Sequence, residues 1–111
     1  MAPLELLAFP IPDGFEVVAV RAVVRCESAQ SYSTVFLSDG RKILVSKGLS
    51  ALERGLPDGW FVRCHDRFLV GRLHVRRFLK KDGLRLVMAD GAEIPVAQRR
   101  RAAVIGCFLG V

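Results

Sequence analysis

The chain has 111 residues, of which 51% are hydrophobic and 25% charged, and its net charge is +6. This length supports one domain with one core, and the composition excludes a disordered chain. The longest apolar stretches are too short to cross a bilayer, which needs about 20 residues. Residues 1–9 lack the basic region of a signal peptide, so a cytoplasmic protein without membrane contact is expected.

The first half of the chain predicts strands. Residues 1–13 contain three prolines and are expected to form an irregular lead-in to a domain over residues 14–111. Apolar, β-branched runs predict strands over Phe15–Val20, Ala22–Cys26, Tyr32–Ser38 and Arg41–Ser46. The Asp39-Gly40 turn makes the last two strands a hairpin, because glycine accepts a positive φ at low cost.

A short helix is expected over Gly48–Leu56, where three leucines recur at helical spacing. Ser50 and Glu53 have the spacing of a capping box, and Ser46 is an alternative start. The Pro57-Asp58-Gly59 turn ends this helix.

The second half returns to short strands and turns. Strands are expected over Trp60–Cys64, Phe68–Val70, His74–Leu79, Leu84–Met88 and Glu93–Val96. A terminal helix is expected over Ala102–Leu109. Many short strands separated by regular turns predict a mainly β domain with one short central helix and a C-terminal helical segment.

The excess of positive over negative charge lies in the second half of the chain. Residues 1–60 contain six Lys or Arg and seven Asp or Glu, whereas residues 61–111 contain eleven and four. Such an asymmetry favours a polyanionic partner, with nucleic acid ahead of a membrane or an acidic protein. A solvated basic face that keeps the protein soluble is the alternative.

The cysteines and the motifs give no sign of catalysis or of a metal. Cys26, Cys64 and Cys107 lack zinc-ligand spacing and are expected to be reduced, mostly as small core side chains. Redox sensing by Cys64 is a weaker alternative. Cys64 and His65 cannot form a catalytic dyad, because neighbouring strand residues point to opposite faces. No nucleotide-binding or metalloprotease motif is present, so neither an enzyme nor a cofactor is expected.

Four segments in a fixed order resemble the LytTR family of bacterial transcription regulators. Residues 61–71 read FVRCHDRFLVG, which is similar to the family's F-x-R-x-H-x-S-F-x-V-N motif. Residues 89–100 read ADGAEIPVAQRR, which is similar to its dG turn and i-P-V-S-R-R motif. The hairpin over residues 32–42 and the helix over residues 46–57 resemble the family's upstream segments. The resemblance covers roughly residues 14–109.

This resemblance implies an elongated arrangement of small antiparallel sheets that binds double-stranded DNA with loops inserted in successive major grooves. By this resemblance, the family's three DNA-contacting loops correspond to Ala29–Tyr32, His65–Arg67 and Ala97–Arg100. The residues expected to contact DNA are Ser31, Tyr32, His65, Asp66, Arg67, Gln98, Arg99, Arg100 and Arg101. No metal, cofactor or catalytic residue is implied.

Several of these residues have alternative roles. Tyr32 is equally an ordinary aromatic on a strand face, and His65 equally forms a structural hydrogen bond in its turn. Asp66 is expected either to accept a hydrogen bond from cytosine N4 or to form an ion pair with Arg67, and the ion pair is the preferred interpretation. Further basic residues follow, half of them expected to flank the duplex and half to be solvated: Arg72, Arg76, Arg77, Lys80, Lys81 and Arg85.

The sequence departs from the family pattern at four positions within the expected contact regions. Asp66 stands where the family commonly has Asn or Arg, and Gly71 stands where it has Asn. Ala97 and Gln98 stand where it has Ser and Arg. Arg67 replaces a serine and restores a cation. These departures motivate an alternative function, a protein-interaction module that has lost specific DNA binding. In that case the apolar C-terminus could dock a partner protein, although closing the core is the preferred interpretation. Its apolar residues are Ile105, Phe108, Leu109 and Val111.

The first hypothesis is therefore a sequence-specific transcription regulator. The resemblance implies direct repeats in promoters as the DNA partner and includes the option of a dimer on DNA. About a dozen residues precede the first expected strand, so a stand-alone domain without a receiver domain is expected. Its regulation would then come from its expression level, from a partner protein or from an additional N-terminal segment.

Overall fold

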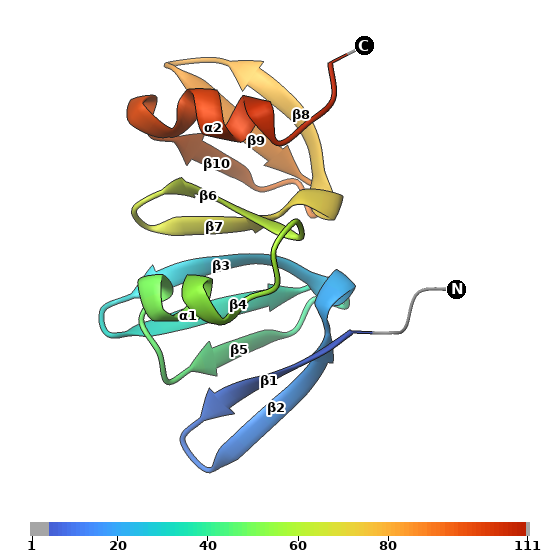
Figure 1. Cartoon of the computed structure of the whole chain (residues 1–111), viewed down its shortest axis with the longest axis vertical. Coiled ribbons are helices and arrows are strands. Elements are labelled where there is room, and N and C mark those ends of the chain that lie inside the picture. The colour runs from blue at the N-terminus through green and yellow to red at the C-terminus, as the bar shows by residue number, and fades with distance from the viewer. Residues whose placement is uncertain (1–4, 111) are drawn as a thin grey trace.

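The computed structural model describes residues 5–110, which form three antiparallel sheets (Figure 1). The two-stranded sheet contains β1 (Leu6–Ile11) and β2 (Gly14–Ala19). The five-stranded sheet has the order β5 (Lys42–Val45), β4 (Tyr32–Leu37), β3 (Val23–Ala29), β7 (Phe68–Gly71), β6 (Phe61–His65). The three-stranded sheet has the order β10 (Glu93–Val96), β9 (Leu84–Met88), β8 (Val75–Lys80).

Short helical segments connect and flank these strands. The helix α1 (Leu49–Gly55) separates β5 from β6, and α2 (Arg101–Gly106) follows β10. Three 3-10 turns complete the described chain: η1 (Val20–Ala22), η2 (Arg72–His74) and η3 (Gln98–Arg100). The expected mainly β fold with a short central helix and a C-terminal helical segment is confirmed. Neither helix of residues 5–110 has the length and apolar character needed to cross a membrane.

The expected irregular lead-in is wrong for residues 6–11, which form β1. This strand pairs with β2 from Leu6↔Ala19 to Ile11↔Gly14, and Phe9 is buried in the core. Pro10 fits because proline is tolerated in edge strands, and its carbonyl oxygen accepts the Ser46 N–H at 2.8 Å. Residues 1–4 of the expected lead-in and the C-terminal Val111 lie outside the described residues.

The central sheet separates two hydrophobic cores. Strands β3 and β7 contribute to both, because successive side chains of a strand point to opposite faces. Val23 and Leu69 belong to the core beneath α1, whereas Val24 and Val70 belong to the core closed by β9, β10 and α2. The strand pair β3–β7 therefore joins the two halves of the domain.

The start of α1 differs from both expected caps. The residue before the helix is Gly48, and no side chain caps the first turn. Glu53, which has capping-box spacing to Ser50, instead extends its carboxylate to Arg63 at 2.7 Å. Its role is thus to fix a neighbouring strand rather than its own helix.

Gly71 lies where two backbone segments come close together. A Cβ atom added there would lie 2.4 Å from the Val23 carbonyl oxygen and 3.2 Å from that of Val24. Both distances are shorter than a normal contact, and the backbone oxygens belong to β3, the central strand. Only glycine leaves room for this approach.

Two of the three cysteines are core residues. Cys26 and Cys64 are fully buried, and Cys107 is half-buried. Burial raises the pKa of the Cys26 thiol to about 12. Burial also raises the pKa of the Cys64 thiol to about 12, although the charges of Arg100 and Arg63 act in the opposite direction. The expectation of small core side chains is confirmed for these two residues.

Substituting alanine for Gly71 should destabilise the domain by about 1–3 kcal/mol, because β3 and β7 must separate to admit the methyl group. Gly55→Ala is the matched control, since nothing lies within 4 Å of an added Cβ at the end of α1. The control should leave stability unchanged or raise it by up to about 1 kcal/mol. The free energy of unfolding from urea titration measures both, and equal effects would contradict the close approach.

A thiol reagent at pH 8 should modify Cys107 alone in the folded protein and all three cysteines in guanidinium. A pKa near 12 lowers the thiolate fraction about a thousandfold relative to an ordinary thiol. Counting modified thiols against time, with a Cys107→Ser control, measures this. Rapid modification of Cys64 in the folded control would show that the redox-sensing alternative still stands.

Candidate functional site

Three connecting segments, two between strands and one between β10 and α2, meet at one edge of the molecule (Figure 1). They are Gln30–Tyr32 after β3, His65–Arg67 between β6 and β7, and Ala97–Arg100 after β10. We call these three segments the loop edge. Two backbone hydrogen bonds hold them together, from the Ser28 N–H to the Arg67 oxygen at 2.9 Å and from the Ala97 N–H to the Cys64 oxygen at 2.8 Å. Their proximity follows directly from the sheet order.

The first of these connections is tighter than expected. Strand β3 runs to Ala29 and β4 begins at Tyr32, so only Gln30 and Ser31 form the turn. Gln30 adopts a φ of 58°, as a two-residue hairpin turn requires. Ser31 is exposed, and Tyr32 is 44% exposed at the start of its strand.

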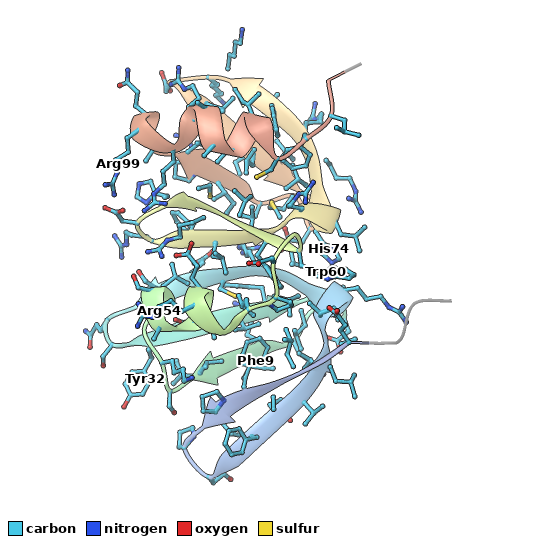
Figure 2. All side chains as sticks on the ribbon, in the orientation of Figure 1. Phe9, Tyr32, Arg54, Trp60, His74 and Arg99 are labelled. Carbon is cyan, nitrogen blue, oxygen red and sulfur yellow. The ribbon has the colours of Figure 1, made fainter. Side chains whose placement is uncertain are left out.

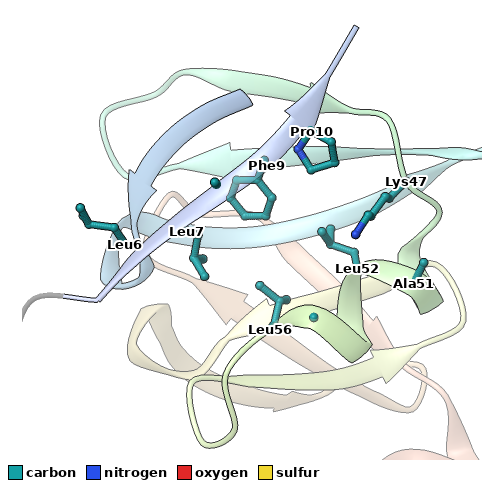
Figure 3. Close-up of a pocket in the computed structure, with 10 residues that line it drawn as sticks. Leu6, Leu7, Phe9, Pro10, Lys47, Ala51, Leu52 and Leu56 are labelled. Atoms are coloured by element: carbon teal, nitrogen blue, oxygen red, sulfur yellow. The ribbon is translucent and has the colours of Figure 1, made fainter. Parts of the chain in front are cut away.

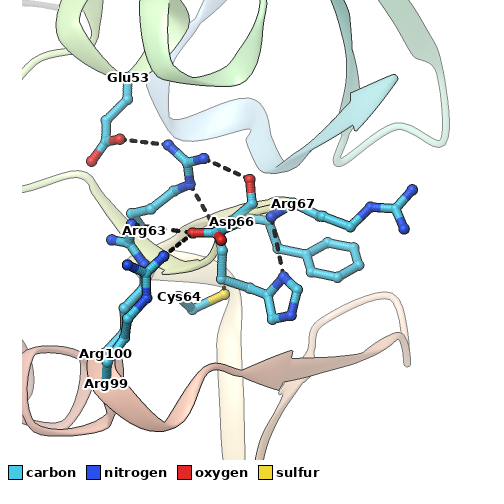
Figure 4. A network of polar contacts seen from close by, with 9 residues as sticks. Glu53, Arg63, Cys64, Asp66, Arg67, Arg99 and Arg100 are labelled. Atoms are coloured by element: carbon cyan, nitrogen blue, oxygen red, sulfur yellow. Dashed lines mark hydrogen bonds and ion pairs between the residues drawn. The ribbon is translucent and has the colours of Figure 1, made fainter. Parts of the chain in front are cut away.

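The second connection is fixed by a buried arginine. The Arg63 side chain is only 8% exposed, and its guanidinium donates to the carbonyl oxygens of His65 at 2.8 Å and Asp66 at 2.6 Å. The same group pairs with Glu53 of α1 (Figure 4). Because three different partners hold one planar group, the backbone of this turn is preorganised.

His65 forms a structural hydrogen bond within its turn, which was one of its two expected roles. Its Nδ1 accepts the Arg67 N–H at 3.1 Å, and its ring packs against Phe68 with centroids 5.4 Å apart. Within residues 5–110, Nε2 of this ring makes no hydrogen bond. The side chain thus shapes the turn and leaves one ring nitrogen for a ligand.

Asp66 pairs with the third connection and not with Arg67. Its Oδ1 accepts a hydrogen bond from Arg99 Nη2 and lies 3.6 Å from Arg100 Nη2. Figure 4 shows the Arg67 side chain extending away from this carboxylate. The preferred interpretation of an Asp66–Arg67 pair is therefore wrong, because residues adjacent in a turn project in different directions. The exposed Arg67 guanidinium faces solvent instead.

The three consecutive arginines do not form one surface. Arg99 is 67% exposed and Arg100 is 30% exposed, and both face Asp66. Arg101 lies near the β8–β9 turn, where its Nη2 would be 3.7 Å from a Cβ on Gly83. Successive residues of a helical segment point about 100° apart. Arg101 is thus separated from its two neighbours, while Gln98 is exposed beside them.

Sequence reasoning missed the positioning residues of this site. Arg63 is a charged residue among the apolar residues Phe61, Val62 and Cys64 and occupies the Arg position of the family motif, and both were available signals. Glu53 gave no signal beyond its capping spacing. Figure 2 also places Arg54 of α1 on the same edge as Tyr32 and Arg99, although the helix was treated only as scaffold.

Gly71 was counted among the expected contact regions, and the structure places it elsewhere. It ends β7 at the edge opposite the Asp66–Arg67 turn, against the backbone of β3. Of the further basic residues, Arg72 is also structural. It donates to the carbonyl oxygens of Gly59 and Cys107 and lies 5.6 Å from the Phe108 ring centroid.

One hollow of the molecule lies between β1 and α1. It measures about 270 Å³ and is lined by apolar side chains such as Leu7, Leu52 and Leu56 (Figure 3). Among its described lining residues, Lys47 is the one that carries a charge. Among residues 5–110, no three His, Cys, Asp or Glu side chains converge as a metal site would require.

Comparison with solved structures identifies a similar fold. The LytTr DNA-binding domain of a response regulator from Bacillus cereus superimposes with a TM-score of 0.78. The match covers 92% of this chain and 94% of that chain, at 22% sequence identity. No curated protein matches the chain.

A family model gives the assignment. The model described as the LytTr DNA-binding domain matches residues 13–106, which is most of the chain. That range includes all three connections of the loop edge. The chain therefore belongs to the family of LytTr DNA-binding domains.

Proposed function

We propose that this domain binds double-stranded DNA sequence-specifically through the loop edge and thereby regulates transcription. The observation that carries the proposal is the convergence of three connections at one edge, with the cations Arg67 and Arg99 exposed on two of them. The role is recognition and not catalysis, in keeping with a DNA-binding family.

The hairpin form of two of these turns suits a major groove. That groove is about 12 Å wide and admits a two-stranded ribbon. The Gln30–Ser31 and Asp66–Arg67 turns are hairpin tips of this kind, and η3 presents Gln98 and Arg99 beside them. Two tips held on one sheet, with η3 beside them, can thus contact DNA without a recognition helix.

The residues of the loop edge then divide into two roles. Ser31, Tyr32 and Arg67 are suited to phosphate contacts, which position a protein on the duplex without reading sequence. Gln98 carries an amide that can bind adenine through two hydrogen bonds, and Arg99 can donate to guanine O6 and N7. Arg100 is only partly exposed and supports Arg99 more than it reaches outward.

The regulator itself would act on paired sites. Direct repeats in promoters, occupied by two copies of the domain, are the DNA partner that we propose. The signal that controls binding would come from a partner protein or from the amount of the regulator. These proposals rest on the family resemblance, and the loop edge is compatible with them because it occupies one side of the molecule.

A second candidate function is docking of a protein through apolar residues near the C-terminus. Leu109 is 96% exposed and Ile105 is 47% exposed, and Leu73, which is 56% exposed, lines a surface hollow together with Phe108. Val104 already closes the core, so Ile105 and Leu109 are not needed for that purpose. An apolar interface of this kind would be insensitive to salt, whereas DNA binding weakens as salt rises.

Selection of bound duplexes from a random pool should enrich a short, repeated sequence. In Arg99→Ala/Arg100→Ala, affinity for that sequence should fall, and the slope of log affinity against log salt should flatten by up to about two. Fluorescence anisotropy at several salt concentrations measures both quantities.

The matched control is Arg21→Ala/Arg76→Ala, which removes the same charge near η1 and η2, on the edge opposite the loop edge (Figure 1). It should retain most of the affinity and the same sequence preference. Equal losses in the two double variants would mean that net charge, and not the loop edge, carries binding. A pool without enrichment, together with no binding at low salt, would favour protein docking.

A further inference from the structure

The ion pair between Asp66 and Arg99 is an unusual feature for a surface that meets DNA. It places a carboxylate among the cations of the loop edge, and the two partners are 66% and 67% exposed. An exposed pair of this kind contributes little to stability. The fold therefore does not depend on it, and both groups are free to meet a ligand.

We propose that Asp66 and Arg99 act as one unit that reads a single G·C base pair in the major groove. This inference rests on the proposed DNA-binding function and assigns a base preference within it. The unit consists of an acceptor and a donor from two different connections, held in contact before DNA arrives.

The chemistry of the base pair matches this unit. In the major groove, guanine presents two acceptors, O6 and N7, directly beside the N4 donor of its cytosine. Arginine is a donor to guanine, and aspartate is an acceptor from cytosine N4. A donor fixed beside an acceptor is therefore complementary to the edge of one G·C pair in one orientation.

Other base pairs fit this unit less well. Thymine presents an O4 acceptor and a methyl group where cytosine has its N4 donor. The Asp66 carboxylate would face that oxygen without a proton between them. The unit therefore discriminates through a repulsive contact as well as an attractive one.

The surroundings keep Asp66 in place for this role. Arg63 fixes the backbone of the turn, and both known contacts of the carboxylate use Oδ1. Within residues 5–110, Oδ2 accepts no hydrogen bond and is free for cytosine N4. Arg100, 3.6 Å from Oδ1, offsets the negative charge when phosphates approach.

The test is a double-mutant cycle on the DNA that the selection enriches. Affinities of the wild-type protein, Asp66→Ala, Arg99→Ala and the double variant are measured on that duplex and on each single base-pair change. One G·C position should be preferred by about tenfold or more in the wild type. Each single variant should lose most of that preference, and the double variant should lose no more than either one.

Asp58→Asn is the control, because it removes one negative charge from an exposed turn before the other end of β6. It should leave the preference at every position unchanged. If Asp66→Ala strengthens binding to all duplexes equally and keeps every preference, the carboxylate only offsets charge and the inference is overturned. A wild-type protein that enriches no sequence overturns the proposed function itself, and this inference with it.

Discussion

Strands β3 and β7 are the elements that both cores share. Their pairing joins Arg25↔Val70, Cys26↔Leu69 and Glu27↔Phe68, and the side chains of Leu69 and Val70 enter opposite cores. Because these two residues are almost completely buried, the register of the pair cannot slip without exposing one core. The close approach at Gly71 belongs to the same constraint, since it brings β7 directly against the β3 backbone.

The loop edge is a consequence of that register. Once Glu27 faces Phe68, the Ser28 N–H meets the Arg67 oxygen, and the β6–β7 turn lies beside the β3–β4 turn. Asp66 of the β6–β7 turn then pairs with Arg99 of η3, which follows β10. Side chains far apart in the sequence are thus presented together by backbone hydrogen bonds between strands, and the exposed Asp66–Arg99 ion pair adds little to this arrangement.

Much of the fold could be predicted from local patterns. Alternating apolar residues and the Asp39-Gly40 turn gave strands β4 and β5, and three leucines gave α1. The first strand was missed because Pro10 was taken as a breaker, although a proline in an edge strand costs no sheet hydrogen bond. Whether a strand will lie at an edge is a property of the whole sheet, which local pattern does not contain.

The site was harder to predict than the fold. The family motif located the three connections correctly in the sequence. It did not show where neighbouring side chains point, so Asp66 was paired with Arg67, and Arg101 was grouped with Arg99. The actual partner of Asp66 is 33 residues away. The anchoring role of Arg63 likewise depends on Glu53 from a helix and on two carbonyl oxygens of a turn. Such contacts exist only after the chain has folded.

The position of the 57–59 turn has a consequence for protein engineering. It is the covalent link between a segment that holds β1 to β5 with α1 and a segment that holds β6 to β10 with α2. A cut there interrupts no sheet, because the two segments already meet along the β3–β7 strand pair and not through the turn. Separation of the two fragments newly exposes one strand edge on each, β3 on the first and β7 on the second, and such complementary edges are what a split-protein reporter requires.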